Sequence, residues 1–110
     1  MTIHEMVSFT GEDYMLRQLA EECCELGQAA LKVVRAINEE TPMSMGEARE
    51  NLVEELADVL NMIGIVKVGI LTEVENYDVA MEGDRKMDRF RDRIEAAEEA
   101  RLMASMEGPA

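Results

Sequence analysis

The segment LRQLAEECCELGQAALKVVRAIN, residues 16–38, decides the fold. Its apolar side chains return every three or four residues, and this spacing places them on one face of an α-helix. Thr10 followed by Asp13 has the form of a capping box, the side-chain pattern that opens many helices. We therefore expect a helix from about Gly11 to Asn38.

A second helical pattern lies in NLVEELADVLNMIGIVKVG, residues 51–69. Pro42 separates it from the first pattern, because proline disfavours helical backbone in the residue before it and has no amide hydrogen to donate. Ser44 with Glu47 forms another capping box, and Gly69 is expected to follow the last helical residue. The short connection predicts that the two helices are antiparallel neighbours.

A third helix is predicted from Glu73 to about Ala104. Thr72 with Glu75 has the form of a capping box at its start, and Gly83 is a weak point inside it. The tail, residues 105–110, is expected to fray.

These patterns predict an all-α fold, an antiparallel helical bundle of the four-helix type. The 110 residues are expected to form one domain, residues 1–110, with a core at about 11–104. The first ten residues are expected to form either a turn of helix or an arm that covers a functional site. So short a chain leaves much of its surface exposed, so we expect the bundle to be completed in a homodimer or homotetramer.

The net charge and the cysteines indicate which partners and which cellular compartment the protein is expected to have. The formal net charge of -13 opposes attraction to nucleic acid or to anionic lipid. No apolar run approaches the roughly 18 residues that span a bilayer, and the N-terminus lacks the pattern of a signal peptide. Cys23 and Cys24 are adjacent in a helical stretch and fit a reduced compartment. The expectation is a cytoplasmic protein without nucleic-acid or membrane partners.

Carboxylates recur at matching positions in the first two predicted helices. Successive residues of a helix turn by about 100°, so Glu22 and Glu25 lie about 60° apart on one face. Glu55 and Asp58 repeat this spacing on the second helix. Any single glutamate is ordinarily part of a solvated helix face. Two pairs on antiparallel neighbours, however, are able to face each other.

Four facing carboxylates would repel one another and take up protons unless cations neutralise them. Hard oxygen ligands select Mg²⁺, for which Mn²⁺ is able to substitute, and Mg²⁺ bound in this way also binds substrate phosphates. The sequence therefore predicts a divalent cation site between the two helices.

The same residues carry a resemblance to a known family. Glu21-Glu22-Cys23-Cys24-Glu25 has the form EExxE, and Glu55-Leu56-Ala57-Asp58 has the form ExxD. In this order, with their flanking residues and a later Lys86-x-x-Arg89-x-x-x-Arg93, they resemble the MazG-like, dimeric dUTPase-like and phosphoribosyl-ATP pyrophosphohydrolases. The resemblance covers residues 16 to 94.

The resemblance implies an enzyme that hydrolyses a nucleoside triphosphate, NTP or dNTP, to NMP and pyrophosphate in nucleotide-pool house-cleaning. It implies that Glu21 orients or deprotonates the attacking water and that four residues hold Mg²⁺: Glu22, Glu25, Glu55 and Asp58. The interval from Glu25 to Glu55 is long for this family, which leaves the subfamily and the preferred base and sugar open.

Five of the 11 basic residues fall between Arg85 and Arg93. Lys86, Arg89 and Arg93 form one stripe on the third helix and are candidates for binding the substrate phosphates. The alternative is a salt-bridged surface helix with Arg85–Asp88 and Arg89–Asp92 pairs. The sequence alone does not choose between these interpretations, and the family resemblance favours phosphate binding.

Further substrate-binding candidates lie beside the carboxylates. Gln18 and Lys32 are seven residues to either side of Glu25 and share its stripe, and Asn61 follows Asp58 by three residues. Each is more often simply solvated. Four other residues are expected to have packing roles and no catalytic role. Tyr77 and Phe90 are expected in a core or an interface, and Cys23 and Cys24 are expected as small core residues.

Two other classes compete with this interpretation. A di-iron carboxylate bundle requires Glu-x-x-His on two helices, which the single histidine, His4, does not supply. A non-catalytic acidic interaction protein of the DNA-mimic type fits the net charge. Such a mimic would spread its acids over the surface and would not need aligned pairs.

Overall fold

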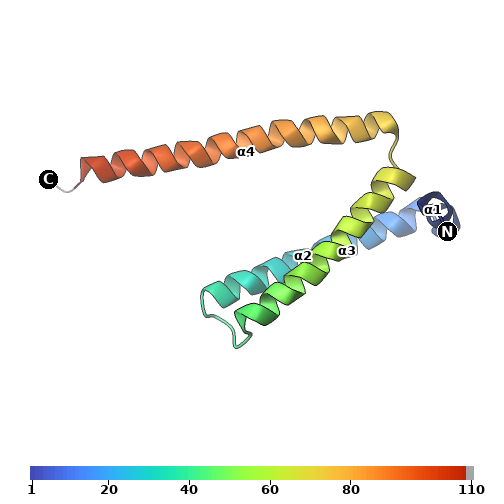
Figure 1. Ribbon diagram of the computed structural model, residues 1–110, viewed down its shortest axis with the longest axis horizontal. Coiled ribbons are helices and arrows are strands. Elements are labelled where there is room, and N and C mark those ends of the chain that lie inside the picture. The colour runs from blue at the N-terminus through green and yellow to red at the C-terminus, as the bar shows by residue number, and fades with distance from the viewer. Residues whose placement is uncertain (109–110) are drawn as a thin grey trace. The chain divides into compact units, whose positions relative to one another are not determined.

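The structure, a computed structural model, describes residues 1–108 and is built from four α-helices (Figure 1). Their bounds are Ile3–Thr10 for α1, Glu12–Ile37 for α2, Met45–Gly69 for α3 and Glu73–Glu107 for α4. No strand occurs among these residues, so the predicted all-α class is confirmed. The chain divides into two compact units, of which the first, Met1–Thr72, contains α1 to α3 and the second contains α4.

Helices α2 and α3 pack along each other and run in opposite directions, as the colour gradient in Figure 1 shows. Each buries one face against the other. Ala29 of α2 and Ala48 of α3 are only 1% and 0% exposed, because a methyl side chain lets the two backbones approach closely. The core is completed by larger side chains from the three helices of this unit: Val7, Met15, Val33 and Val59.

The start of α3 confirms Ser44 as the N-cap residue, although only the Ser44 half of the predicted capping box is present. The Ser44 side-chain oxygen accepts a hydrogen bond from the Glu47 backbone amide at 3.1 Å, and the helix begins at the next residue, Met45. This bond satisfies one of the amides that a helix leaves unpaired at its N-terminus.

The predicted capping box at Thr10 is wrong. Residues 3–10 form a helix of their own, α1, and Thr10 is its last residue. The Thr10 hydroxyl donates back to the Met6 carbonyl at 3.0 Å instead of capping α2. Gly11, at φ 95°, joins the two helices with a backbone conformation that other residues rarely adopt. Of the two alternatives for the N-terminus, the helical one is correct.

The predicted role of Gly69 is also wrong. This glycine is the last residue of α3, and the residue after it, Ile70, has a φ of -121° and is not left-handed. A Cβ atom at Gly69 would lie 2.6 Å from Val7 Cγ2 and 3.2 Å from Ile3 Cγ2. The glycine therefore allows α1 to pack against the end of α3.

Helix α4 begins directly after Thr72, as predicted, and continues past Gly83 without a break. It extends beyond the expected end at Ala104 to Glu107, so this part of the tail is helical. Pro109 and Ala110 lie outside the described residues. Within α4 no described side chain is buried, so this helix has no core of its own.

Replacing Gly69 with alanine is expected to lower the free energy of unfolding by about 1–3 kcal/mol, because the added methyl group overlaps Val7. Gly46→Ala, in the first turn of the same helix, is the matched control. Its Cβ would meet only Ser44 Oγ at 3.9 Å, so alanine there should be neutral or stabilising. Chemical denaturation of both variants measures the difference, and equal stability of the two would contradict the close approach.

Candidate metal centre

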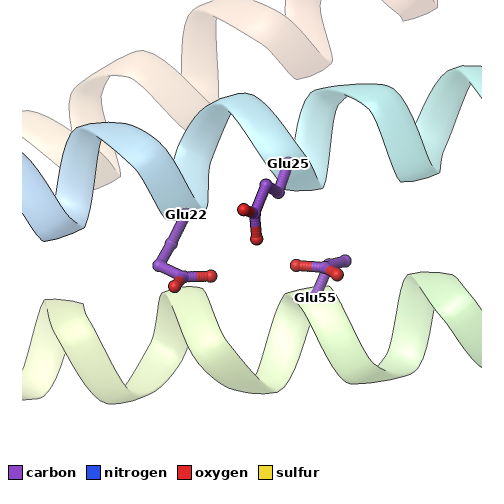
Figure 2. A group of neighbouring side chains, drawn as sticks. All are labelled: Glu22, Glu25 and Glu55. Atoms are coloured by element: carbon purple, nitrogen blue, oxygen red, sulfur yellow. The ribbon is translucent and has the colours of Figure 1, made fainter.

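Three carboxylates meet between α2 and α3 (Figure 2). Glu22 and Glu25 extend from α2, and Glu55 extends toward them from α3. One oxygen from each lies within 4.8 Å of the others, so the three can share one cation. The sequence prediction that these residues meet is therefore correct for three of the four carboxylates.

The helical repeat explains why these acids point inward. Glu22 lies seven residues after buried Met15 and seven before buried Ala29, so it occupies the middle of the buried face of α2. Glu55 follows buried Ala48 by seven residues on α3. Both glutamates are half-buried as a result, at positions where apolar residues are the rule.

This placement leaves two carboxylate oxygens without partners. Glu22 Oε2 and Glu55 Oε2 are buried and accept no hydrogen bond from the described residues. A buried acceptor without a donor is costly, and the cost is greater for an ionised group. A hard cation would satisfy both oxygens, so the donor set fits Mg²⁺ or Mn²⁺.

The pKa values of both groups respond to this environment. Desolvation raises the pKa of Glu22, and the nearby Glu25, Asp58 and Glu55 carboxylates raise it further. Desolvation also raises the pKa of Glu55, as do a side-chain hydrogen bond with Glu25 and the charges of Glu25, Asp58 and Glu54. In both cases burial and like charge favour the protonated form, and a bound cation would oppose this effect.

Asp58 lies at the edge of the cluster. Its side chain is exposed and is not among the three carboxylates that lie within 4.8 Å of one another. Its charge nevertheless raises the pKa values of Glu22 and Glu55, so it is close to both. The Glu54 charge also raises the pKa of Glu55, although Glu54 was not among the predicted site residues. The only signal for it was the doublet Glu54-Glu55.

The other candidates on this unit surround the cluster. Glu21 is exposed on α2, one position before Glu22. Gln18 and Lys32 are half-buried on the same helix. Gln18 lies one turn before Glu22, and Lys32 lies two turns after Glu25. Asn61 is exposed on α3, one turn after Asp58. The structure keeps all four on the two helices that carry the carboxylates, and their roles stay predictions.

The basic stripe lies on α4. Lys86, Arg89 and Arg93 border one surface hollow together with Asp92, so the three cations lie along one side of the helix. The Arg93 guanidinium carbon lies 5.6 Å from the centre of the Phe90 ring, a cation–π contact that orients the arginine.

The ion pairs of α4 differ from the predicted alternative. Arg85 contacts Glu82 at 2.5 Å, and Arg91 contacts Asp88 at 3.3 Å. Neither pair named in that alternative, Arg85–Asp88 or Arg89–Asp92, forms among the described residues. Each arginine that forms a pair uses an acid one turn before it, so these pairs do not involve Lys86, Arg89 or Arg93.

One packing prediction is corrected, for the two cysteines. Cys23 and Cys24 are exposed rather than buried in a core, because they lie about 100° and 200° around α2 from the inward-facing Glu22. Tyr77 and Phe90 are 64% and 52% exposed on α4, so they form no core within that helix, and their packing in a core or an interface stays a prediction.

Comparison with known proteins adds no relative. No protein-family model, curated protein or solved structure matches the chain. The family resemblance therefore stays a prediction from the two motifs, their order and the residues around them. Within residues 1–108, every helix is too short or too polar to cross a lipid bilayer.

The raised pKa values of Glu22 and Glu55 predict a pH-dependent stability. The folded, metal-free protein binds these two protons more tightly than the unfolded chain does. Proton binding at Glu22 and Glu55 therefore stabilises the fold fully below the ordinary carboxyl pKa of about 4.3. This stabilisation is lost as the pH rises through the raised pKa values. Mg²⁺ competes with the protons, so stabilisation by Mg²⁺ should grow over the same interval.

Denaturation at a series of pH values, with and without Mg²⁺, measures both effects. The control is the double variant Glu22→Gln, Glu55→Gln, in which this part of the pH dependence and the Mg²⁺ effect should both disappear. If wild type and double variant respond identically to pH and to Mg²⁺, the cluster does not bind the cation.

Proposed function

We propose that the protein is a Mg²⁺-dependent nucleoside triphosphate pyrophosphohydrolase that converts an NTP or dNTP to NMP and pyrophosphate. The observation that carries the proposal is the pair of buried, unpartnered oxygens on Glu22 and Glu55 beside Glu25. A purely acidic interaction protein has no reason to bury carboxylates against each other, because its charges act from the surface. Motif order supports the MazG-like family over other Mg²⁺ enzymes.

In this proposal Glu22, Glu25 and Glu55 hold Mg²⁺, and Asp58 completes the ligand set from the edge of the cluster. The ion supplies charge neutralisation of the triphosphate and lowers the pKa of a nearby water molecule. Mn²⁺ is able to substitute, because it accepts the same oxygen ligands.

Glu21 acts on the water molecule. It is exposed beside Glu22, so its carboxylate is accessible to a water at the edge of the cluster, and it accepts a proton as the water attacks the α-phosphorus. A new bond forms between the water oxygen and the α-phosphorus, and the bond from this phosphorus to the bridging oxygen of the β-phosphate breaks. Pyrophosphate leaves with the electron pair, and NMP remains.

Basic and amide side chains bind the substrate. Lys86, Arg89 and Arg93 contact the β- and γ-phosphates and stabilise the departing pyrophosphate, since guanidinium groups form paired hydrogen bonds with phosphate oxygens. Gln18, Lys32 and Asn61 contact the phosphate, sugar or base from α2 and α3. The assembly is a homodimer or homotetramer in which copies complete an antiparallel four-helix bundle, and the enzyme acts in the cytoplasm.

Removing one cation ligand tests the proposal directly. Glu55→Gln should lower Mg²⁺-dependent pyrophosphate release by at least about 100-fold while leaving the helical content unchanged, because a neutral amide is a poor ligand for Mg²⁺. Glu50→Gln, an exposed glutamate on the same helix, is the control and should retain full activity.

The assay is a panel of nucleoside triphosphates with Mg²⁺, in which the products are identified. NMP with pyrophosphate supports the proposal, and the preferred nucleotide identifies the substrate. Release of NDP with phosphate, or turnover by Glu55→Gln equal to that of the control, would overturn it.

The basic stripe makes a separate prediction. Arg89→Ala should raise KM for the triphosphate about 10-fold or more, because a charge-assisted contact to phosphate is lost. Arg91→Ala removes the same charge from the same helix, but Arg91 is paired with Asp88, so its KM should stay near that of wild type. Steady-state kinetics of the two variants distinguishes phosphate binding from general electrostatic attraction, for which both variants would show the same loss.

A further inference from the structure

The acids of α2 and α3 define one side of the helix pair. Counting about 100° per residue from the inward-facing Glu22 and Glu55, four acids lie about 60–100° around their helices in the same rotational sense: Glu21, Glu25, Glu54 and Asp58. Because α2 and α3 are antiparallel, the same rotational sense leads to the same side of both helices. We call this the acidic side.

Tyr14 lies on the acidic side near the start of α2. It is the only aromatic residue of α2 and α3, and it lies about 80° around the helix from Glu22, in the same sense as the acids. Its side chain is 49% exposed, so the ring is not part of the buried core. Eight residues of helix, about 12 Å, separate it from Glu22. This span is comparable with the length of a nucleoside monophosphate.

Two amides lie between Tyr14 and the carboxylates. Glu25 and Glu55 meet across the pair, so residues equally far from them along the two helices lie at about the same height. Asn61 is therefore about level with Gln18, one turn beyond Tyr14 toward the carboxylates. Each side-chain amide has both donors and an acceptor, the groups that pair with the edge of a nucleobase.

Helix α1 closes the end of the pair that carries Tyr14. It contacts both α2 and α3 at this end (Figure 1). A Cβ atom at Gly69, in the last turn of α3, would lie only 2.6 Å from Val7 of α1. The tyrosine ring is therefore near a closed end of the helix pair.

The opposite end of the acidic side carries a cation. Lys32 is the only basic residue of α2 and α3 that lies within about 100° of the inward direction on this side. It forms no ion pair with Glu47, which is about level with it on α3, or with any other described residue. Long helical side chains extend toward the helix N-terminus, so the ammonium group is directed back toward Glu25, seven residues or about 10 Å along α2.

The acidic side thus has an aromatic and amide end, a carboxylate centre and a cationic end. We propose that the nucleotide of the proposed function, on which this inference rests, lies along this side with its base against the Tyr14 ring and its triphosphate directed toward Lys32. The reverse direction would place the phosphates among uncharged amides and the base beside an ammonium group, with no ring to stack on.

This orientation assigns a separate role to each end. The Tyr14 ring stacks on the face of the base, an interaction that every base can make, so it contributes affinity without selecting among bases. Gln18 and Asn61 contact the base edge and determine which base is preferred. The Lys32 ammonium neutralises phosphate charge beyond the cation, where pyrophosphate departs.

Isothermal titration calorimetry of the full chain with Mg²⁺ tests the base end without catalysis. The ligands are the α,β-methylene analogues of ATP, GTP, CTP and dUTP, together with inorganic tripolyphosphate, which has no base. Tyr14→Leu should raise Kd for the analogue that wild type binds most tightly by at least about 5-fold, because stacking is lost. Its Kd for tripolyphosphate should stay unchanged. Tyr14→Phe retains the ring and should bind both ligands like wild type.

The same titrations test the phosphate end. Lys32→Ala should raise Kd for the analogue and for tripolyphosphate alike, by at least about 5-fold, because both ligands lose the same charged contact. Arg49→Ala removes the same charge from α3 at about 120° in the opposite rotational sense, and it should bind both ligands like wild type. Circular dichroism confirms that each variant is helical.

The outcomes separate the orientation from the proposed function. Equal binding of the analogue by Tyr14→Leu and Tyr14→Phe, or a loss in Lys32→Ala that is confined to the analogue, would overturn the orientation while wild-type binding and cleavage of nucleotides still support the enzyme. A wild type that binds no analogue would overturn both.

Discussion

The structure depends on one electrostatic constraint, the placement of carboxylates where two packed helices would ordinarily present apolar side chains. Glu22 and Glu55 occupy the inward positions of the repeat that also buries Met15, Ala29 and Ala48. Their unpartnered oxygens and raised pKa values follow directly from that position. Cation binding is the simplest way to relieve both the desolvation and the mutual repulsion, and it gives the acids a reason to be there.

The same helix pair separates two kinds of surface. On one side of their shared interface, α2 and α3 both present carboxylates. On the opposite side, both present small and bulky apolar residues. The buried core of the first unit is small, at six side chains, so most of the apolar side chains of α2 and α3 lie outside it.

The sequence predicted the features that depend on periodicity. It located α2, α3 and α4 to within a few residues, and it placed Glu22, Glu25 and Glu55 on facing sides, because a period of 3.6 residues fixes direction. The predictions from sequence failed where a tertiary contact determines the local structure. Thr10 belongs to α1 because the hydroxyl bonds back to Met6, and Gly69 is required by the close approach of Val7, which no local pattern reveals. Exposure of Cys23 was missed because one helical pattern does not distinguish a face covered by the chain from one left open.

The central claim is that Glu22, Glu25 and Glu55 bind a divalent cation. The most direct measurement is a crystal of the protein soaked in Mn²⁺, with data collected at the manganese absorption edge. The account predicts an anomalous peak between α2 and α3 with carboxylate oxygens of all three residues at coordination distance, about 2.0–2.3 Å. Ordered carboxylates that instead hydrogen-bond to one another, with no peak between them, would contradict it.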